Sequence, residues 1–312
     1  MGTNPPPDVA RVAVLRLGRL GDLVMTVPAL QWLVAAGLDV ALICAPRYAA
    51  LMESLAPGVT ALAPDDVGDE SLSALLDLHR TPESSPLARR LTVAGPRIHL
   101  RKESLARRGL LLGWSGPART WPQRHLEAAE RLLVGLRVAA PGMPAPRPRA
   151  PLRAQGEVVG LAVGAGHETK RWPAEHFAAV ASALRDAGRE VVVLAAPDEA
   201  AWAYRAAPPG VEVRLPETPL ALAEAMAGFG VIVGGDTGTT WLAAALGVRV
   251  VALFGPTPVR AGFFVWGEPS VALSTGERCA PCSMHGGPKC PRTHHRCMGE
   301  LLPAQVLEAV GL

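Results

Sequence analysis

The sequence predicts an α/β protein made of two domains, and three observations support this. The length of 312 residues is enough for two cores of ordinary size. Short β-branched runs alternate with longer segments whose apolar residues recur at helical spacing, which is typical of β/α units with a parallel sheet. A proline-rich stretch at 138–156 interrupts this alternation as a linker would. We therefore predict one domain at 1–150 and a second at 151–312.

Residues 230–256 are the stretch around which the second half is organised. A short β-branched run here predicts a buried parallel strand, and a glycine-rich turn follows it. Asp236, Thr237 or Gly238 can cap a helix that runs to about Leu246. The first N–H groups of such a helix have no partners within it, and its positive dipole end faces outward, so an anion can bind there. The predicted ligand site lies at the carboxyl ends of the strands.

The first strand, predicted at 12–17, leads to a second candidate position. Asp22 falls in the first turn of the following helix, which is predicted at 21–36 with a kink at Pro28. The helix dipole favours an acidic residue there whatever its function. The same residue also lies at the carboxyl end of a strand, where open α/β sheets present their ligands. Asp22 is therefore either a helix-start residue or a site residue.

The remaining predicted elements continue the alternation of strands and helices. In the first half they are strands at 40–44, 59–62 and 75–78, and a helix at 125–136. In the second half they are strands at 158–163, 191–194, near Val211, 248–254 and 271–273, and helices at 173–187, 219–228 and 303–310. This order predicts two β/α domains joined by one linker.

Three phrases occur in order along the chain: VAVLRLGRLGDLVMTVPAL, GLAVGAGHETKRWPAEHF and GDTGTTWLAAALGVRVVALFGPT. Together with the ending CAPC…C…CMGELLPAQVLEAV, they resemble family 9 glycosyltransferases, the ADP-heptose:lipopolysaccharide heptosyltransferases. The resemblance implies the GT-B fold, in which two Rossmann-like domains face a cleft. It also implies that the N-terminal domain binds the acceptor and the C-terminal domain binds the nucleotide sugar.

The function that the resemblance implies is an inverting sugar transfer that needs no metal for catalysis. A heptose would pass from an ADP-activated donor to an acidic glycolipid acceptor of the lipopolysaccharide-core type. Such a transfer requires charge stabilisation on the departing diphosphate and a base for the acceptor hydroxyl. The resemblance gives the first role to Lys170 and the second to Asp22. Without the resemblance, Lys170 would be read as a solvated loop lysine.

The resemblance also implies binding residues in both domains. The predicted donor-binding residues are Gly166, Thr169, Lys170, Glu199, Asp236, Thr237, Gly238 and Trp241. The predicted acceptor-binding residues are Arg19, His79 and Arg101. The amides and hydroxyl of the Asp-Thr-Gly motif are expected to hold the diphosphate, and Glu199 the ribose or base. His79 alone would be an ordinary surface histidine.

Some positions depart from the family pattern. Trp241 stands where the family commonly has a histidine, and Gly166 stands where a serine or threonine is usual. Ala195 and Ala196 replace expected glycines in the loop before Glu199. These departures leave the donor sugar open. The alternatives are a nucleotide-sugar-binding protein without transfer activity, or a transferase with another nucleotide sugar or a non-lipopolysaccharide acceptor.

Four of the five cysteines lie close together in the C-terminal segment, at Cys279, Cys282, Cys290 and Cys297. This spacing in a cytosolic chain favours a thiolate-ligated metal, most simply a structural zinc ion. Reduced structural thiols and disulfides are the alternatives, and an iron–sulfur cluster fits the spacing less well. Cys44 lies in a predicted strand and is expected to be part of the core.

Charge is concentrated between Arg80 and Arg149, where 14 basic residues face four acidic ones. This segment is either a solvated helical face or a surface for an acidic partner. Nucleic acid is not the expected partner, because the segment lacks interleaved aromatic residues and any recognisable binding motif.

The sequence contains neither a membrane span nor a secretory signal by its pattern. No apolar run reaches the ~18 to 20 residues that cross a bilayer. The start, MGTNPPPDVA, lacks the basic and apolar regions of a signal peptide. We therefore expect a cytoplasmic protein, whose basic segment could contact the cytoplasmic face of the inner membrane.

Overall fold

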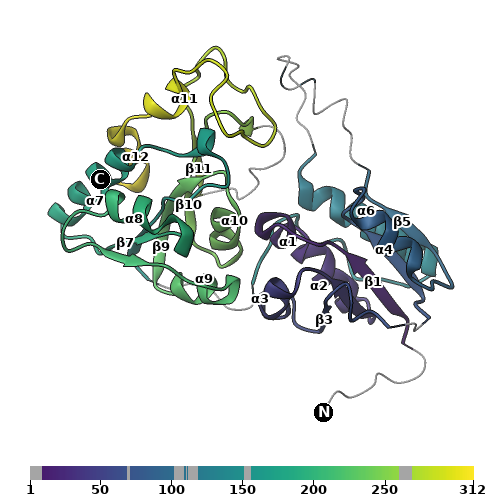
Figure 1. Cartoon of the computed structure of the whole chain (residues 1–312). Coiled ribbons are helices and arrows are strands. Elements are labelled where there is room, and N and C mark those ends of the chain that lie inside the picture. Colours follow the sequence, from purple (N-terminus) through teal and green to yellow (C-terminus); the bar gives the residue numbers. More distant parts are fainter. Residues whose placement is uncertain are drawn as a thin grey trace. The chain divides into compact units, whose positions relative to one another are not determined.

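The computed structural model describes residues 9–68, 71–101, 109, 111, 119–150, 156–259 and 269–312. The chain divides into two compact units, Met1–Lys102 with Trp121–Pro151 and Glu103–Thr120 with Leu152–Leu312. Each unit contains one sheet whose paired strands all run parallel, and helices connect the strands (Figure 1). The predicted α/β class is confirmed.

The first unit contains a five-stranded sheet in the order β3-β2-β1-β4-β5. Its strands are β1 (Arg11–Leu15), β2 (Asp39–Ile43), β3 (Val59–Leu62), β4 (Ala74–Asp77) and β5 (Arg97–His99). Its helices are α1 (Leu20–Val24), α2 (Val27–Ala35), η1 (Pro46–Tyr48), α3 (Ala49–Leu55), α4 (Ser84–Arg90) and α6 (Trp121–Leu136). The strand order reverses between β1 and β4, and the carboxyl ends of strands at such a switch point are the usual ligand position.

The second unit contains a six-stranded sheet in the order β11-β10-β9-β6-β7-β8. Its strands are β6 (Val158–Ala162), β7 (Val191–Leu194), β8 (Glu212–Arg214), β9 (Phe229–Gly235), β10 (Arg249–Leu253) and β11 (Val271–Leu273). Its helices are η2 (Glu168–Lys170), α7 (Ala174–Asp186), η3 (Pro197–Glu199), α8 (Ala200–Ala206), α9 (Pro219–Ala225), α10 (Gly238–Ala245), α11 (Arg296–Gly299) and α12 (Pro303–Val310). The switch point lies between β6 and β9.

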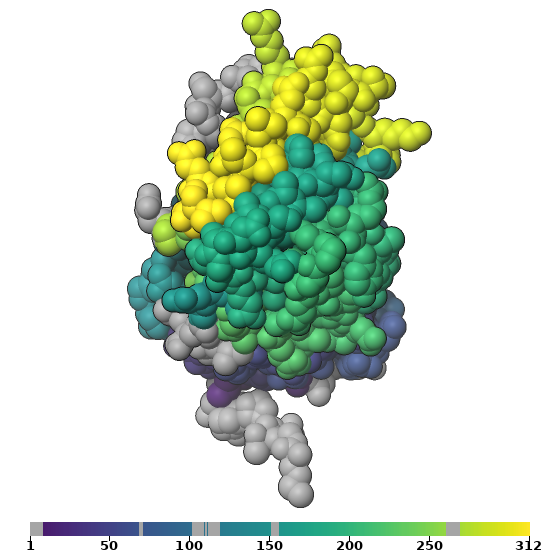
Figure 2. Space-filling model, turned by 90° about the vertical axis from the view of Figure 1, so that its left-hand side faces the viewer, coloured from purple at the N-terminus to yellow at the C-terminus, as the bar shows by residue number. Residues whose placement is uncertain are grey.

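The C-terminal segment is an integral part of the second unit. Helix α12 packs against α7, β10 and β11, and its Val306 and Val310 are buried in the same core cluster as Phe177 of α7. In the space-filling view, the yellow C-terminal end lies directly against the teal surface formed by the middle of the chain (Figure 2). The segment that carries the clustered cysteines is therefore anchored at its end by core packing.

The predicted helix at 21–36 is wrong in one respect, because the structure contains two helices there. The hydroxyl of Thr26 donates to the carbonyl of Leu23 at 2.6 Å, and its amide bonds the same carbonyl at 2.8 Å. These short bonds end α1, and Pro28 then occupies the first turn of α2, where its missing N–H costs nothing. The break confines Asp22 to a short helix of five residues.

Four elements of the first unit, η1, α3, α4 and β5, were not predicted. Strand β5 has three residues, of which Arg97 and His99 are exposed, so it lacks the apolar run that marks a buried strand. Its place at the sheet edge nevertheless positions His99 beside the end of β4.

None of the described helices is long and apolar enough to cross a bilayer.

Helix α6 packs against α2, β4 and β5 and buries a titratable group. His125 is 0% exposed, and its Nδ1 lies 3.0 Å from the carbonyl oxygen of Met25. Burial and the nearby Arg16 charge lower the pKa of His125 to about 3, although the Met25 carbonyl opposes this shift. The neutral imidazole donates to Met25 and so fixes the turn between α1 and α2.

This burial predicts a pH dependence of folding. The unfolded histidine has a pKa near ~6.5, so below that pH the unfolded chain binds a proton that the folded chain does not. The free energy of unfolding therefore contains the full contribution of the neutral His125 above pH ~6.5. This contribution is lost progressively as the pH drops toward 3. At pH 5.5 the loss should be about 1.4 kcal/mol. Urea unfolding at pH 7.5 and 5.5 gives the difference in the free energy of unfolding between the two pH values. This difference should be smaller in His125→Gln than in the wild-type protein by about the same amount. Equal pH dependence in both proteins would contradict the assignment.

Candidate functional site

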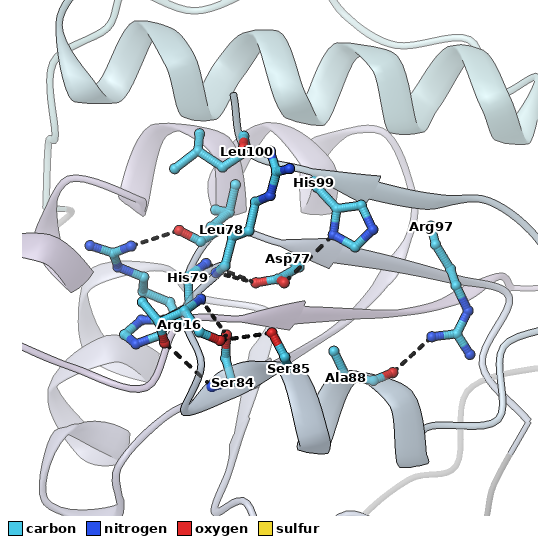
Figure 3. Close-up of polar contacts among 12 residues, drawn as sticks. Arg16, Asp77, Leu78, His79, Ser84, Ser85, Ala88, Arg97, His99 and Leu100 are labelled. Carbon is cyan, nitrogen blue, oxygen red and sulfur yellow. Dashed lines mark hydrogen bonds and ion pairs between the residues drawn. The ribbon is translucent and has the colours of Figure 1, made fainter. Parts of the chain in front are cut away.

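The candidate site of the first unit begins at the end of β1. Asp22 Oδ2 lies 2.9 Å from Nη2 of Arg16, and the side chains are 31% and 9% exposed respectively. The other terminal nitrogen of Arg16, Nη1, donates to the carbonyl oxygen of Leu78 at 2.6 Å (Figure 3). One guanidinium therefore connects β1, the first turn of α1 and the loop after β4.

The loop after β4 is shaped by a buried carboxylate at Asp77. Its Oδ1 accepts the backbone N–H groups of His79 at 2.9 Å and Arg80 at 2.8 Å (Figure 3). These bonds hold Arg80 in a left-handed conformation with φ of 45°, which a residue with a side chain rarely adopts. The other oxygen, Oδ2, lies 3.6 Å from Nδ1 of His99 on β5. Asp77 thus fixes the loop that presents His79.

His79 is a partly buried imidazole near Asp22. Burial lowers the pKa of His79, as does the charge of Arg16, while Asp22, Asp77 and Glu83 oppose the shift. The imidazole is therefore neutral at pH 7. Its Nδ1 is buried and has no hydrogen-bond partner among the described residues.

Basic side chains surround this edge of the first sheet. Arg19 and Arg101 are exposed, and His99 has a side chain that is 50% exposed. Arg131 of α6 donates to the carbonyl oxygen of His99 at 2.9 Å. Burial and the charge of Arg101 lower the pKa of the Arg131 guanidinium. The three predicted acceptor-binding residues, Arg19, His79 and Arg101, therefore all follow or adjoin the carboxyl ends of strands β1, β4 and β5. The edge can attract an anionic ligand.

The candidate site of the second unit centres on an ion pair between two loops. Nζ of Lys170, at the end of η2, lies 2.9 Å from Oδ2 of Asp236, which follows β9. Both side chains are mostly buried, at 13% and 8% exposure. The hydroxyl of Thr257, after β10, donates to the same oxygen at 3.2 Å. The structure therefore brings together the loops that follow β6, β9 and β10.

The start of α10 faces the same edge of the sheet. Thr237 is its N-cap residue, and its N–H donates to the hydroxyl of Thr240 at 3.3 Å. The Thr240 hydroxyl in turn bonds the carbonyl of Gly235 at 3.0 Å. The Thr237 hydroxyl faces the Thr240 amide as in a capping box but makes no hydrogen bond of normal geometry. The Thr237 hydroxyl is thus buried without a hydrogen-bond partner among the described residues, and it lies at a helix start, where an anion can bind the first amides.

Two predicted donor-binding residues lie in surroundings that the sequence did not indicate. Trp241 is 2% exposed and belongs to the core, and its contact with the donor stays a prediction. Glu199 uses its Oε1 internally, accepting the N–H of Ala165 at 3.0 Å and contacting Arg171 at 3.1 Å. Contact between Glu199 and the nucleotide stays a prediction. Gly166 is exposed, and an added Cβ would meet no atom within 4 Å.

The loop that carries Lys170 is held in place by the C-terminal segment. This contact was not predicted from the sequence. The Thr169 hydroxyl accepts the N–H of Gly287 at 2.8 Å, and both the hydroxyl and the N–H of Thr169 bond the Gly287 carbonyl. The ring nitrogen Nε2 of His295 lies 2.8 Å from the Thr169 carbonyl oxygen. A Cβ on Gly286 would come within 2.8 Å of Cδ of Lys170. The C-terminal segment therefore packs directly on the lysine stem.

The same segment also contacts the loop of Thr257. The amides of Cys282 and Ser283 both donate to the carbonyl of Pro256 at 3.0 Å. Residues 282–287 thus join the loop after β10 to the loop after β6. Two features of the sequence could have indicated this link. They are the pair Gly286-Gly287, which permits close approach, and the hydroxyl of Thr257 in the loop after the strand predicted at 248–254.

The cysteines do not assemble as the four-cysteine cluster that was predicted. The structure contains free thiols, and no three of these four sulfur atoms lie within 4.8 Å of one another among the described residues. Instead, Cys279 Sγ lies 3.8 Å from Nε2 of His294, and Glu277 completes a group of three donors within 4.8 Å. Burial raises the pKa of Cys297 to about 11, and the other three cysteines add to this shift. Cys44 is buried, as expected.

Comparisons with known proteins agree with this architecture. The family model for glycosyltransferase family 9 (heptosyltransferase) matches residues 121–288, more than half of the chain. Escherichia coli ADP-heptose lps heptosyltransferase II is 18% identical, with a TM-score of 0.70 over 96% of this chain and 97% of its own. E. coli heptosyltransferase WaaC with ADP is 19% identical, with a TM-score of 0.70 over 96% and 100%. No curated protein sequence matches.

A third solved structure is the iron-containing dodecameric glycosyltransferase TibC from enterotoxigenic E. coli. It is 17% identical, with a TM-score of 0.62 over 97% of this chain and 75% of its own. The predicted GT-B fold, as a pair of parallel α/β sheets, is confirmed by the two heptosyltransferase structures. The chain belongs to glycosyltransferase family 9, the heptosyltransferase family.

Proposed function

We propose that this glycosyltransferase moves a heptose, with inversion, from an ADP-activated donor to an acidic acceptor of the lipopolysaccharide-core type. One observation supports the proposed nucleotide-sugar donor most strongly. Lys170, Asp236 and the start of α10 meet at one edge of the second sheet. A diphosphate there would find an ammonium group, a hydroxyl and helix amides. WaaC was solved with ADP, which supports an adenine nucleotide.

The proposed reaction is a single displacement. Asp22 takes the proton of the acceptor hydroxyl as the acceptor oxygen bonds the anomeric carbon. The bond between that carbon and the diphosphate oxygen breaks at the same time, and ADP leaves with the electron pair. Lys170 and the amides of α10 stabilise the charge that develops on the leaving diphosphate. We propose that these groups perform that role without a metal ion.

The proposed acceptor site is the basic edge of the first sheet. Arg19 and Arg101 are exposed there, and His79 adjoins Asp22. Carboxylates or phosphates on a glycolipid core would bind such a surface, and the wider basic segment could contact anionic headgroups. We place the reaction in the cytoplasm, where nucleotide-activated sugars are found. A different nucleotide sugar, a different acceptor, or nucleotide binding without transfer are the alternatives.

The C-terminal segment is proposed to hold a structural metal ion. Glu277, Cys279 and His294 offer three donors of types that suit zinc, and further cysteines lie nearby. TibC is described as iron-containing, which supports a metal in a related protein. Elemental analysis of untagged protein should find about one metal ion per chain, which Cys279→Ser loses and Cys44→Ser retains. Wild-type protein without metal would overturn this part of the proposal.

Replacing Asp22 by Asn tests the proposed transfer. The amide cannot accept the proton, so turnover with ADP-heptose and a lipopolysaccharide-core acceptor should fall by about 10²- to 10⁴-fold. ADP affinity, measured by calorimetry, should stay within about twofold because the donor groups are in the second unit.

Retained turnover in Asp22→Asn would remove this residue from the mechanism. Absence of turnover in the wild-type protein, with ADP still bound, would instead favour the binding-protein alternative. Preference for UDP over ADP would end the ADP-heptose assignment but not the transferase class.

A further inference from the structure

Arg16 is a buried cation whose place in the first unit is set by two contacts. The residue is 7% exposed, and its backbone N–H bonds the carbonyl of Ile43 as the chain leaves β1. A buried charge is costly unless it is paired. Asp22 supplies the paired charge through Oδ2, and Leu78 supplies a carbonyl acceptor. The remaining nitrogen, Nε, is buried and has no hydrogen-bond partner among the described residues.

These contacts determine how Asp22 is presented. The guanidinium is planar and rigid, so a nitrogen on Oδ2 and another on the Leu78 carbonyl fix the direction of the carboxylate. Among the described residues, no hydrogen bond to Oδ1 of Asp22 is present beside this pair. The side chain of Asp22 is 31% exposed. Oδ2 is paired with Arg16, and Oδ1 has no such partner among the described residues.

The second contact links the carboxylate to the neighbouring loop. Leu78 directly precedes His79, and Asp77 clamps this loop through the amides of His79 and Arg80 (Figure 3). Arg16 therefore joins the Asp22 carboxylate to a loop whose backbone is already fixed. A shift of the loop would be transmitted to Asp22 through a single side chain.

We propose that Arg16 is the positioning residue of the catalytic base. It acts through Asp22, by holding Oδ2 so that Oδ1 faces the acceptor hydroxyl. The contact with Leu78 keeps the carboxylate in a fixed position relative to the loop of His79. This inference rests on the proposed function, in which Asp22 accepts the acceptor proton. The role requires the forked geometry of arginine and not merely its charge.

Two substitutions separate geometry from charge. Arg16→Lys keeps the positive charge but has one nitrogen, which cannot hold both Asp22 and the Leu78 carbonyl in one plane. Arg16→Gln removes the charge. Both should lower kcat by about 10- to 100-fold, because a small misplacement of a reacting group has effects of this size. The KM for ADP-heptose and the Kd for ADP should stay within about twofold, since the donor groups lie in the second unit.

A double-mutant comparison tests whether Arg16 acts through Asp22. If it does, Arg16→Gln should cause no further loss of turnover in the Asp22→Asn background, as measured by ADP release in long incubations. Arg11→Gln is the matched control, because Arg11 pairs with Asp39 at the opposite end of β1. This control should keep kcat within about twofold. A merely structural arginine would lower turnover independently of Asp22, giving multiplied losses.

The outcomes distinguish this inference from the proposed function. If Asp22→Asn abolishes turnover but both Arg16 variants keep wild-type kcat, the positioning role is overturned and the transferase stands. Multiplied losses in the double variant also overturn it. If the wild-type protein shows no transfer, the proposed function itself fails. Urea unfolding checks the fold of each variant, and Arg16→Lys decides alone if Arg16→Gln does not fold.

Discussion

The ion pair between Lys170 and Asp236 is the contact on which the second unit's site depends. The two residues are far apart in sequence and meet because β6 and β9 are adjacent parallel strands whose carboxyl ends share one edge. A mostly buried ion pair gains little net stability, because both charges lose their hydration. This pair lies at a strand-end edge, with Thr257 on the same carboxylate oxygen, and it is where we propose that the donor diphosphate binds.

The C-terminal segment gives this ion pair its rigidity. Hydrogen bonds between Thr169 and Gly287, together with the close approach of Gly286 to the lysine stem, restrict the position of Lys170. Core packing of α12 anchors the segment at its far end. A segment rich in cysteine and histidine therefore supports the loop of Lys170 directly. In the first unit, Arg16 gives comparable support to Asp22 through the ion pair with its carboxylate.

Local sequence patterns predicted most of the helices and strands but not which distant segments contact one another. Helix α12 was predicted at 303–310, where it is found, because an apolar helical pattern begins at a proline. Strand β5 was missed because Arg97 and His99 leave it no apolar run. Contacts such as Thr169 with Gly287 depend on how distant segments pack, which no local pattern records. The four-cysteine spacing predicted a cluster, yet His294 is the neighbour of Cys279, because the fold of the loop sets side-chain direction.

The central claim is that the diphosphate of the donor binds at Lys170. Calorimetric titration of ADP into wild-type protein, Lys170→Met and Lys289→Met tests it most directly, because Lys289 is an exposed lysine of the same C-terminal segment. We expect Lys170→Met to weaken binding by about tenfold or more, since a charge-assisted contact to phosphate is lost, and Lys289→Met to leave it within about twofold. Equal ADP affinity in all three proteins would contradict the account.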